Sequence, residues 1–147
     1  MGKIINNRTL TAENLLRLPS PVILLCAQRL DFDKIIMDAD TKFVNLNLPL
    51  AKALTGKTRI EIRSVITDTV IDLMPKNEAV YLTDYEMLFD PRYELDVIKL
   101  FCEISRHNRL TVKWCGILEN DSLIYAEPGF DDYSKYKISE YKIACII

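Results

Sequence analysis

Apolar and polar residues follow two different periods along this chain, and the switching predicts strands that alternate with helices. Continuous apolar runs of strand length stand at 21–27 and 79–83, a pattern typical of strands covered on both faces. In segment 62–73 the apolar residues instead recur at i, i+3, i+4, i+7 and i+8, which predicts a helix with one buried face. Strands joined by helices favour right-handed crossovers and a mostly parallel sheet.

Caps and chain breakers predict the remaining elements. Thr11 begins a short helix that ends before Pro19, and Asn47 is the expected N-cap of a helix that Gly56 ends. Further helices are expected at 28–39 and 94–106, and further strands at 42–48, 109–115, 123–126 and 141–147. Segments 116–122 and 127–136 are interpreted as a turn and a loop. The pattern predicts one three-layer α/β domain over residues 1–147, with about five mostly parallel strands and a small antiparallel addition near the C-terminus.

Composition narrows the classes of function. With 147 residues and 49% hydrophobic content, the chain fits a single domain that buries its own core. Nineteen basic and 21 acidic residues leave a net charge of −2, so no overall field favours nucleic acid or a membrane surface. The four cysteines form no CxxC pair, no histidine cluster accompanies them, and no metal site is expected. No apolar run reaches the ~20 residues of a membrane span, so we expect a cytoplasmic protein.

Two carboxylates, Asp84 and Glu86, follow the apolar run at 79–83. Ligands of an open parallel sheet bind outside the carboxyl ends of its strands, so acids at this point are positioned for metal or water. This is the layout of a Walker B element, although many buried strands end in an aspartate before a turn. Asp84 and Glu86 are therefore the candidate catalytic residues.

The phosphate loop that should accompany such an element is degenerate. None of the four glycines stands directly after the first long strand, at 21–27, where a phosphate loop would need them. Segment Gln28–Ile35 keeps the length of GxxxxGK[ST], with Lys34 as its lysine, but glutamine and aspartate replace the glycines and Ile35 replaces the hydroxyl residue. Asp31 and Asp33 would repel a polyphosphate, since like charges ~4 Å apart cost about 4 kcal/mol at an effective dielectric constant of 20. We therefore expect ATP–Mg to bind weakly or not at all.

A second segment, Ala51–Thr58, also matches a relaxed phosphate-loop pattern. It ends in Gly-Lys-Thr, so Lys57 and Thr58 are candidate cofactor-binding residues beside Lys34. Against this, residues 49–54 have the pattern of a helical turn, and a single glycine leaves larger side chains to crowd a phosphate. The alternative is that Gly56 ends a helix.

An ordered set of short pieces resembles a known family. From Phe43 to Tyr136, roughly two thirds of the chain, the sequence resembles the BrxF-like small P-loop proteins of BREX-type bacteriophage-defence systems. The matching pieces are 44–48, 82–91, 104–109, 114–116 and 123–129, followed by Tyr133 and Tyr136. The resemblance implies a P-loop NTPase-like (AAA/ASCE-type) fold, with Asp84 as the Walker B acid, Glu86 near the water site and a degenerate Walker A at Gln28–Ile35.

Two further groups of side chains are candidates for contacts with a partner. Arg106 and Arg109 could reach a neighbouring subunit's phosphates or a nucleic-acid backbone, as arginine fingers do; the alternative is that they pair with the acids of segment 90–96. Tyr133 and Tyr136 belong to a stretch rich in tyrosine and acid that suits protein contact, or else forms a hairpin over the sheet. His107 lies in an expected turn, where we predict a surface role.

These observations lead to three hypotheses about function. The favoured one is an accessory subunit of an anti-phage defence system, a scaffold that contacts other protein subunits or itself, with no cofactor beyond weak ATP–Mg binding. The first alternative is an active ATPase that uses Lys34, or Lys57 and Thr58, together with Asp84 and Glu86. The second alternative is a DNA-binding module.

Overall fold

A computed structural model describes residues 2–6, 11–25 and 32–147 of the chain. The first half contains β1 (Lys3–Ile5), α1 (Ala12–Arg17), β2 (Val22–Leu24), α2 (Phe32–Asp38), β3 (Lys42–Asn45), α3 (Asn47–Leu54) and α4 (Arg59–Leu73). The second half contains β4 (Val80–Thr83), the 3₁₀ turns η2 (Glu86–Phe89) and η3 (Pro91–Tyr93), α5 (Val97–Ile104), β5 (Leu110–Lys113), β6 (Ile117–Glu119), β7 (Ser122–Tyr125), β8 (Ser134–Lys137), η4 (Ile138–Glu140) and β9 (Ala144–Ile146).

The main sheet has six strands in the order β1-β9-β2-β5-β4-β3, and every pairing in it is parallel. A mostly parallel α/β sheet was predicted and is confirmed, as is the small antiparallel addition, which is a second sheet in the order β6-β7-β8. The patterns missed β1, β6 and β8, because most of their residues are exposed or of intermediate burial and none forms an apolar run.

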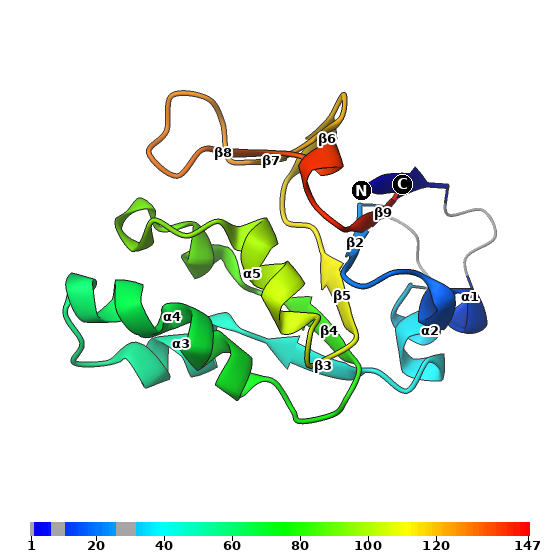
Figure 1. Ribbon diagram of the computed structural model, residues 1–147, viewed down its shortest axis with the longest axis horizontal. Coiled ribbons are helices and arrows are strands. Elements are labelled where there is room, and N and C mark those ends of the chain that lie inside the picture. Colours follow the sequence, from blue (N-terminus) through cyan, green and yellow to red (C-terminus); the bar gives the residue numbers. More distant parts are fainter. Residues whose placement is uncertain (1, 7–10, 26–31) are drawn as a thin grey trace.

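Alternation along the central strands sends side chains to two apolar layers. In β4, Val80 and Leu82 join the larger cluster beneath α3, α4 and α5, whereas Tyr81 joins the smaller cluster that α1 and α2 cover. Ile23 and its neighbours in β2 divide in the same way. Helices therefore cover both faces of the parallel sheet, as such a sheet requires (Figure 1). In the described part of the chain, no helix is both long and apolar enough to cross a membrane.

The small sheet is attached to the main domain through a cluster of aromatic rings. Phe89 stacks on Tyr125 with ring centroids 3.8 Å apart and planes 5° from parallel. Phe89 also meets Trp114 edge-on, and Trp114 meets Tyr136 in the same way. Tyr136 in turn contacts Tyr141, which precedes β9. This cluster ties η2, the residue that follows β5 and the two hairpin strands β7 and β8 into one core.

Local capping explains most helix ends, with one correction. The hydroxyl of Thr11 accepts from the N–H of Asn14, as expected of the N-cap of α1. Gly56, with φ +81°, follows α3, which confirms that a helix ends there. The predicted N-cap role of Asn47 is wrong: α3 begins at Asn47 itself, and no side chain caps it.

Candidate functional site

The carboxyl ends of β3, β4 and β5 meet at one edge of the main sheet, which we call the Asp84 edge and define as residues 45–47, 83–87 and 113–115. Asp84 directly follows β4 with φ 50°, in the left-handed region, and its side chain is exposed. A pocket of about 190 Å³ lies between the ends of β4 and β5, lined by Asp84, Glu86 and Lys113 among others. The structure thus places both predicted carboxylates at the edge where parallel sheets bind ligands.

Asn47 organises the Asp84 edge by three hydrogen bonds to the segment after β4. Its backbone N–H donates to the carbonyl of Asp84 at 2.6 Å, and its side-chain amide donates to the Glu86 carboxylate at 2.9 Å. Its side-chain oxygen accepts from the N–H of Met87 at 3.2 Å. Glu86 is therefore held in place, whereas the carboxylate of Asp84 faces solvent. Sequence reasoning missed this role, because an asparagine before a helix has the local pattern of an N-cap.

Burial keeps two further ionisable groups of the Asp84 edge, those of Tyr85 and Cys115, neutral. Tyr85 is fully buried, its hydroxyl donates to the carbonyl of Lys113 at 2.7 Å, and burial raises its pKa far above the ordinary value. Burial likewise raises the pKa of the Cys115 thiol to about 11. A thiol that stays protonated at neutral pH is a poor nucleophile, so Cys115 is a packing residue.

The chemistry available at the Asp84 edge is that of two oxygen donors and one exposed cation. Asp84 and Glu86 could hold a Mg²⁺ ion that keeps most of its waters, and Lys113 is exposed beside them. Over residues 2–6, 11–25 and 32–147, no three histidine, cysteine, aspartate or glutamate side chains gather into a metal-binding group.

The first candidate phosphate loop, Gln28–Ile35, lies partly outside the described residues, which resume at Phe32 in α2. Lys34 stands in the first turn of α2 with an exposed side chain. Ile35 is 8% exposed and packs in the cluster beneath α1 and α2. The position where a phosphate loop needs a hydroxyl is therefore occupied by a core residue.

The second candidate, Ala51–Thr58, is a junction between two helices. Residues 51–54 are the last turn of α3, and the N–H of Lys57 donates to the carbonyl of Leu54 at 3.1 Å. The hydroxyl of Thr58 accepts from the N–H of Glu61 at 3.3 Å and so caps α4. The backbone of this segment ends α3 and leads into α4, so the alternative in which Gly56 ends a helix is the one observed.

Arg106 and Arg109 lie just before β5 begins, at the amino ends of the strands, on the side of the sheet opposite the Asp84 edge. The guanidinium of Arg109 donates to the carbonyls of Leu15 and Leu18, at 2.9 and 2.6 Å, and burial lowers its pKa. It therefore holds the end of α1. Arg106 is exposed and lies 3.4 Å from Glu103.

The predicted pairing of these arginines with the acids of segment 90–96 is wrong, because each of those acids has another partner. Asp90 binds Arg92 at 2.6 Å, and Glu94 lies 3.4 Å from Arg63. Asp96 caps α5 and accepts from the hydroxyl of Tyr141 at 2.8 Å.

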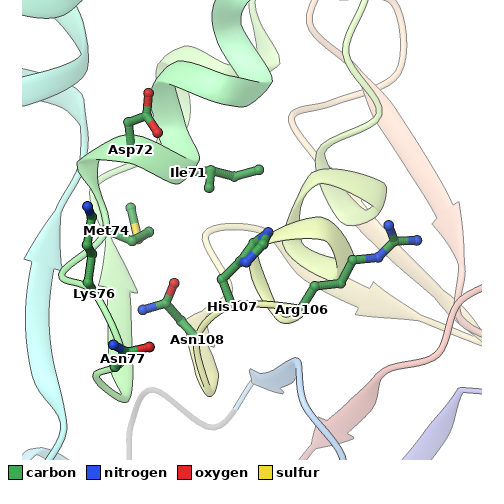
Figure 2. A pocket seen from close by; sticks show the side chains of 8 residues that line it. All are labelled: Ile71, Asp72, Met74, Lys76, Asn77, Arg106, His107 and Asn108. Atoms are coloured by element: carbon green, nitrogen blue, oxygen red, sulfur yellow. The ribbon is translucent and has the colours of Figure 1, made fainter.

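A pocket of about 400 Å³ lies beside Arg106, between the ends of α4 and α5 (Figure 2). Asn108, only 6% exposed, donates from its amide to the carbonyls of Pro75 and Glu78, at 2.7 and 3.0 Å, and so joins the two loops. Figure 2 shows the guanidinium of Arg106 directed away from Asn108. His107 is exposed, as predicted. Both helices end at this pocket, and the partial negative charge of helix C-termini disfavours an anion here.

The two tyrosines proposed as contact residues differ in burial. Tyr136 is 8% exposed and belongs to the core, so little of its side chain is available for the predicted contact. Its stretch forms β8 of a hairpin that packs on the domain, which was the alternative interpretation. Tyr133 is half-buried and lines a cleft described below.

Comparisons with models of known families, with curated proteins and with solved structures find no match to this chain. The fold and the candidate site define its class: an α/β protein with a six-stranded parallel sheet that presents two carboxylates at the end of an interior strand.

Proposed function

We propose that this chain is an accessory subunit of a BREX-type anti-phage defence system, with a P-loop NTPase-like fold of the AAA/ASCE type, that acts in the cytoplasm by contacting other proteins. The strand order supports this fold. β5 stands between β2, which precedes the degenerate phosphate loop, and β4, which carries Asp84. The ASCE class of P-loop NTPases is named after an additional strand between those two elements.

One observation favours a scaffold role over catalysis. In both candidate phosphate loops, the residue at the position of the magnesium-binding hydroxyl is used for packing or for helix capping. Ile35 is buried where a phosphate loop requires a magnesium-binding hydroxyl, and the hydroxyl of Thr58 is engaged as a helix cap. With both hydroxyl positions used in this way, we infer that Asp84 and Glu86 have no tightly held nucleotide to act on. Binding of ATP–Mg is then weak or absent, and the protein works through its surface.

An active ATPase is a second candidate, favoured by the position of Lys34. This lysine is exposed in the first turn of the helix that follows β2, where a phosphate-loop lysine belongs. Asp84, also exposed, would then bind magnesium at the same edge. In this candidate Lys34 takes part in turnover and Lys57, at the junction of α3 and α4, does not.

Titration of the purified chain with ATP–Mg distinguishes the two candidates. The scaffold predicts no thermal shift at millimolar ATP, because stabilisation follows RT ln(1 + [L]/Kd) and reaches about 2.7 kcal/mol only at about 100 times Kd. Lys34→Ala tests the candidate loop, and Lys57→Ala is the matched control. A shift that Lys34→Ala abolishes and Lys57→Ala preserves would contradict the scaffold and support the ATPase.

Co-purification tests the protein-contact role directly. A tagged chain expressed with its whole gene cluster should recover other protein subunits, or a second copy of itself by light scattering. Recovery of the tagged chain alone, as a monomer at high concentration, would leave the scaffold without a mechanism.

A further inference from the structure

A long cleft separates the hairpin β7–β8 from the segment that follows β4. It consists of two adjoining hollows of about 410 and 620 Å³, which share Phe89, Asp90, Pro91 and Asp131 in their walls. One wall is segment 86–96 and the other is segment 130–136, whose loop reaches out beside it (Figure 1). We call this the hairpin cleft. Its floor is apolar and aromatic, with Phe89 and Tyr136 buried and Phe130 63% exposed at the rim.

Acidic side chains dominate the walls of the hairpin cleft. Its lining includes Glu86, Asp90, Glu94, Asp96, Asp131 and Asp132, against two basic residues, Arg92 and Lys135. Arg92 is bound by Asp90, and Glu94 lies 3.4 Å from Arg63. The remaining charged residues of the lining are four acids, Glu86, Asp96, Asp131 and Asp132, and one base, Lys135. An apolar floor between acidic walls attracts a ligand that carries positive charge and apolar side chains, and it repels the phosphates of DNA.

The cleft also runs along the free edge of β8. In the small sheet β8 is the last strand, and its ladder partners all belong to β7. The N–H of Ile138 donates to the carbonyl of Asp121, and the register then directs the backbone groups of Tyr136 and Ser134 towards β7 as well. The N–H and C=O groups of Lys135 and Lys137 therefore face outward, and Lys135 lines the cleft.

We propose that the hairpin cleft binds an extended basic segment of a partner protein, which adds to the free edge of β8 as a further strand. Backbone hydrogen bonds to Lys135 would supply affinity, while the acidic walls and apolar floor would select alternating basic and apolar side chains. Pairing of two β8 strands would bring the acidic walls of two clefts against each other, so the occupant is not a second copy. The side chains of Lys135 and Lys137 are exposed and can turn to solvent beside a basic segment. This inference rests on the proposed scaffold function and names the chemistry of the partner.

A labelled short peptide that alternates arginine and valine is the probe, with binding to the purified full chain followed by fluorescence anisotropy. Asp131→Asn combined with Asp132→Asn should raise Kd at least about tenfold by removing two charges of the wall. Asp68→Asn with Asp72→Asn removes two exposed charges from α4 and should leave Kd unchanged. Equal weakening by both pairs would show that only net charge matters and would overturn the assignment to the cleft.

Backbone pairing is tested by Lys135→Pro, which removes the outward N–H, against Lys135→Ala, which keeps it. The proline variant should lose most of the binding and the alanine variant should retain it, with circular dichroism confirming that both remain folded. A peptide methylated at alternate backbone nitrogens tests the same bonds without altering the protein. Undiminished binding of the methylated peptide, or no binding of the plain peptide at millimolar concentration, would overturn strand addition.

Two further outcomes distinguish this proposal from pairing with a second copy and from the scaffold function. A dimer that Lys135→Pro dissociates would assign the edge to a second copy and overturn the basic-segment proposal. The peptide assay uses the purified chain alone, whereas the scaffold function is tested by co-purification. Failure of the peptide with successful co-purification therefore removes only the cleft, and failure of co-purification removes the scaffold role itself.

Discussion

The two sides of the main sheet at which its parallel strands begin and end use their polar side chains in different ways. At the edge where β5 begins, Asn108 and Arg109 donate to buried or half-buried loop carbonyls and hold the surrounding loops together. At the Asp84 edge, one carboxylate is exposed and the other is held by Asn47 alone among the described hydrogen bonds. The first edge is structural, and the second presents one exposed carboxylate, that of Asp84, beside the hydrogen-bonded Glu86. Unused polar groups at the carboxyl ends of strands are where ligand chemistry is expected.

The largest effect should come from removing the Asn108 side chain. Asn108→Ala removes a buried amide and leaves the half-buried carbonyls of Pro75 and Glu78 without their donor, so the free energy of unfolding should fall by about 2–3 kcal/mol. Urea denaturation measures this. Lys76→Ala, an exposed change in the same loop, is the control. A loss no larger than that of the control would mean that the two edges do not differ as described.

Asn47 should matter less, since it is only partly buried. Asn47→Ala removes the bonds to Glu86 and Met87 and should lower the free energy of unfolding by about 1–2 kcal/mol. A double-mutant cycle with Glu86→Ala should give a coupling of about 0.5–1 kcal/mol. Additive losses in the cycle would show that Asn47 does not hold the Glu86 carboxylate.

A smaller, pH-dependent effect is expected at Asp90. Its hydrogen bond from Arg92 lowers the pKa of Asp90 below the ordinary value of 3.8, in spite of partial desolvation. A depressed folded-state pKa gives stability that is present above the unfolded-state value and is lost as pH falls through the folded-state value. The Arg92 side chain is 61% exposed and that of Asp90 is 21% exposed, so solvent screens the pair and the effect should stay below about 1 kcal/mol. Stability measured from pH 5 down to pH 2 should fall less steeply in Asp90→Asn than in wild type, and identical slopes would contradict the pairing.

The smallest effect is expected at Asp84. Asp84→Asn should change the free energy of unfolding by less than about 0.5 kcal/mol, because the side chain is exposed and asparagine tolerates the left-handed backbone. Asp84→Val, which does not tolerate φ 50°, should cost about 1–3 kcal/mol. Thermal melts compare the two. If the asparagine variant were the less stable, the Asp84 carboxylate would have a structural role after all.

Sequence patterns predicted the elements whose stability is local. The cap at Thr11, the helix end at Gly56 and the apolar runs of β2 and β4 depend on residues within a few positions of one another. The position of Asp84 and Glu86 at a carboxyl edge followed from the same patterns, because a parallel sheet brings all its strand ends to one side. The chain by itself therefore determined the α/β class and the location of its two candidate acids.

Only the tertiary structure decided which polar residues those elements bring together. Asn47 and Glu86 are 39 residues apart, and Arg109 lies 91 and 94 residues from the carbonyls that it binds. No local period encodes such partners, so Asn47 was mistaken for a cap and the carbonyl partners of Arg109 were not predicted. Tyr136 was misplaced for the same reason: a tyrosine in a polar stretch becomes a core residue only when β8 pairs with β7 and lays its ring against Trp114. Capping acts over one helical turn, whereas burial depends on how distant segments pack.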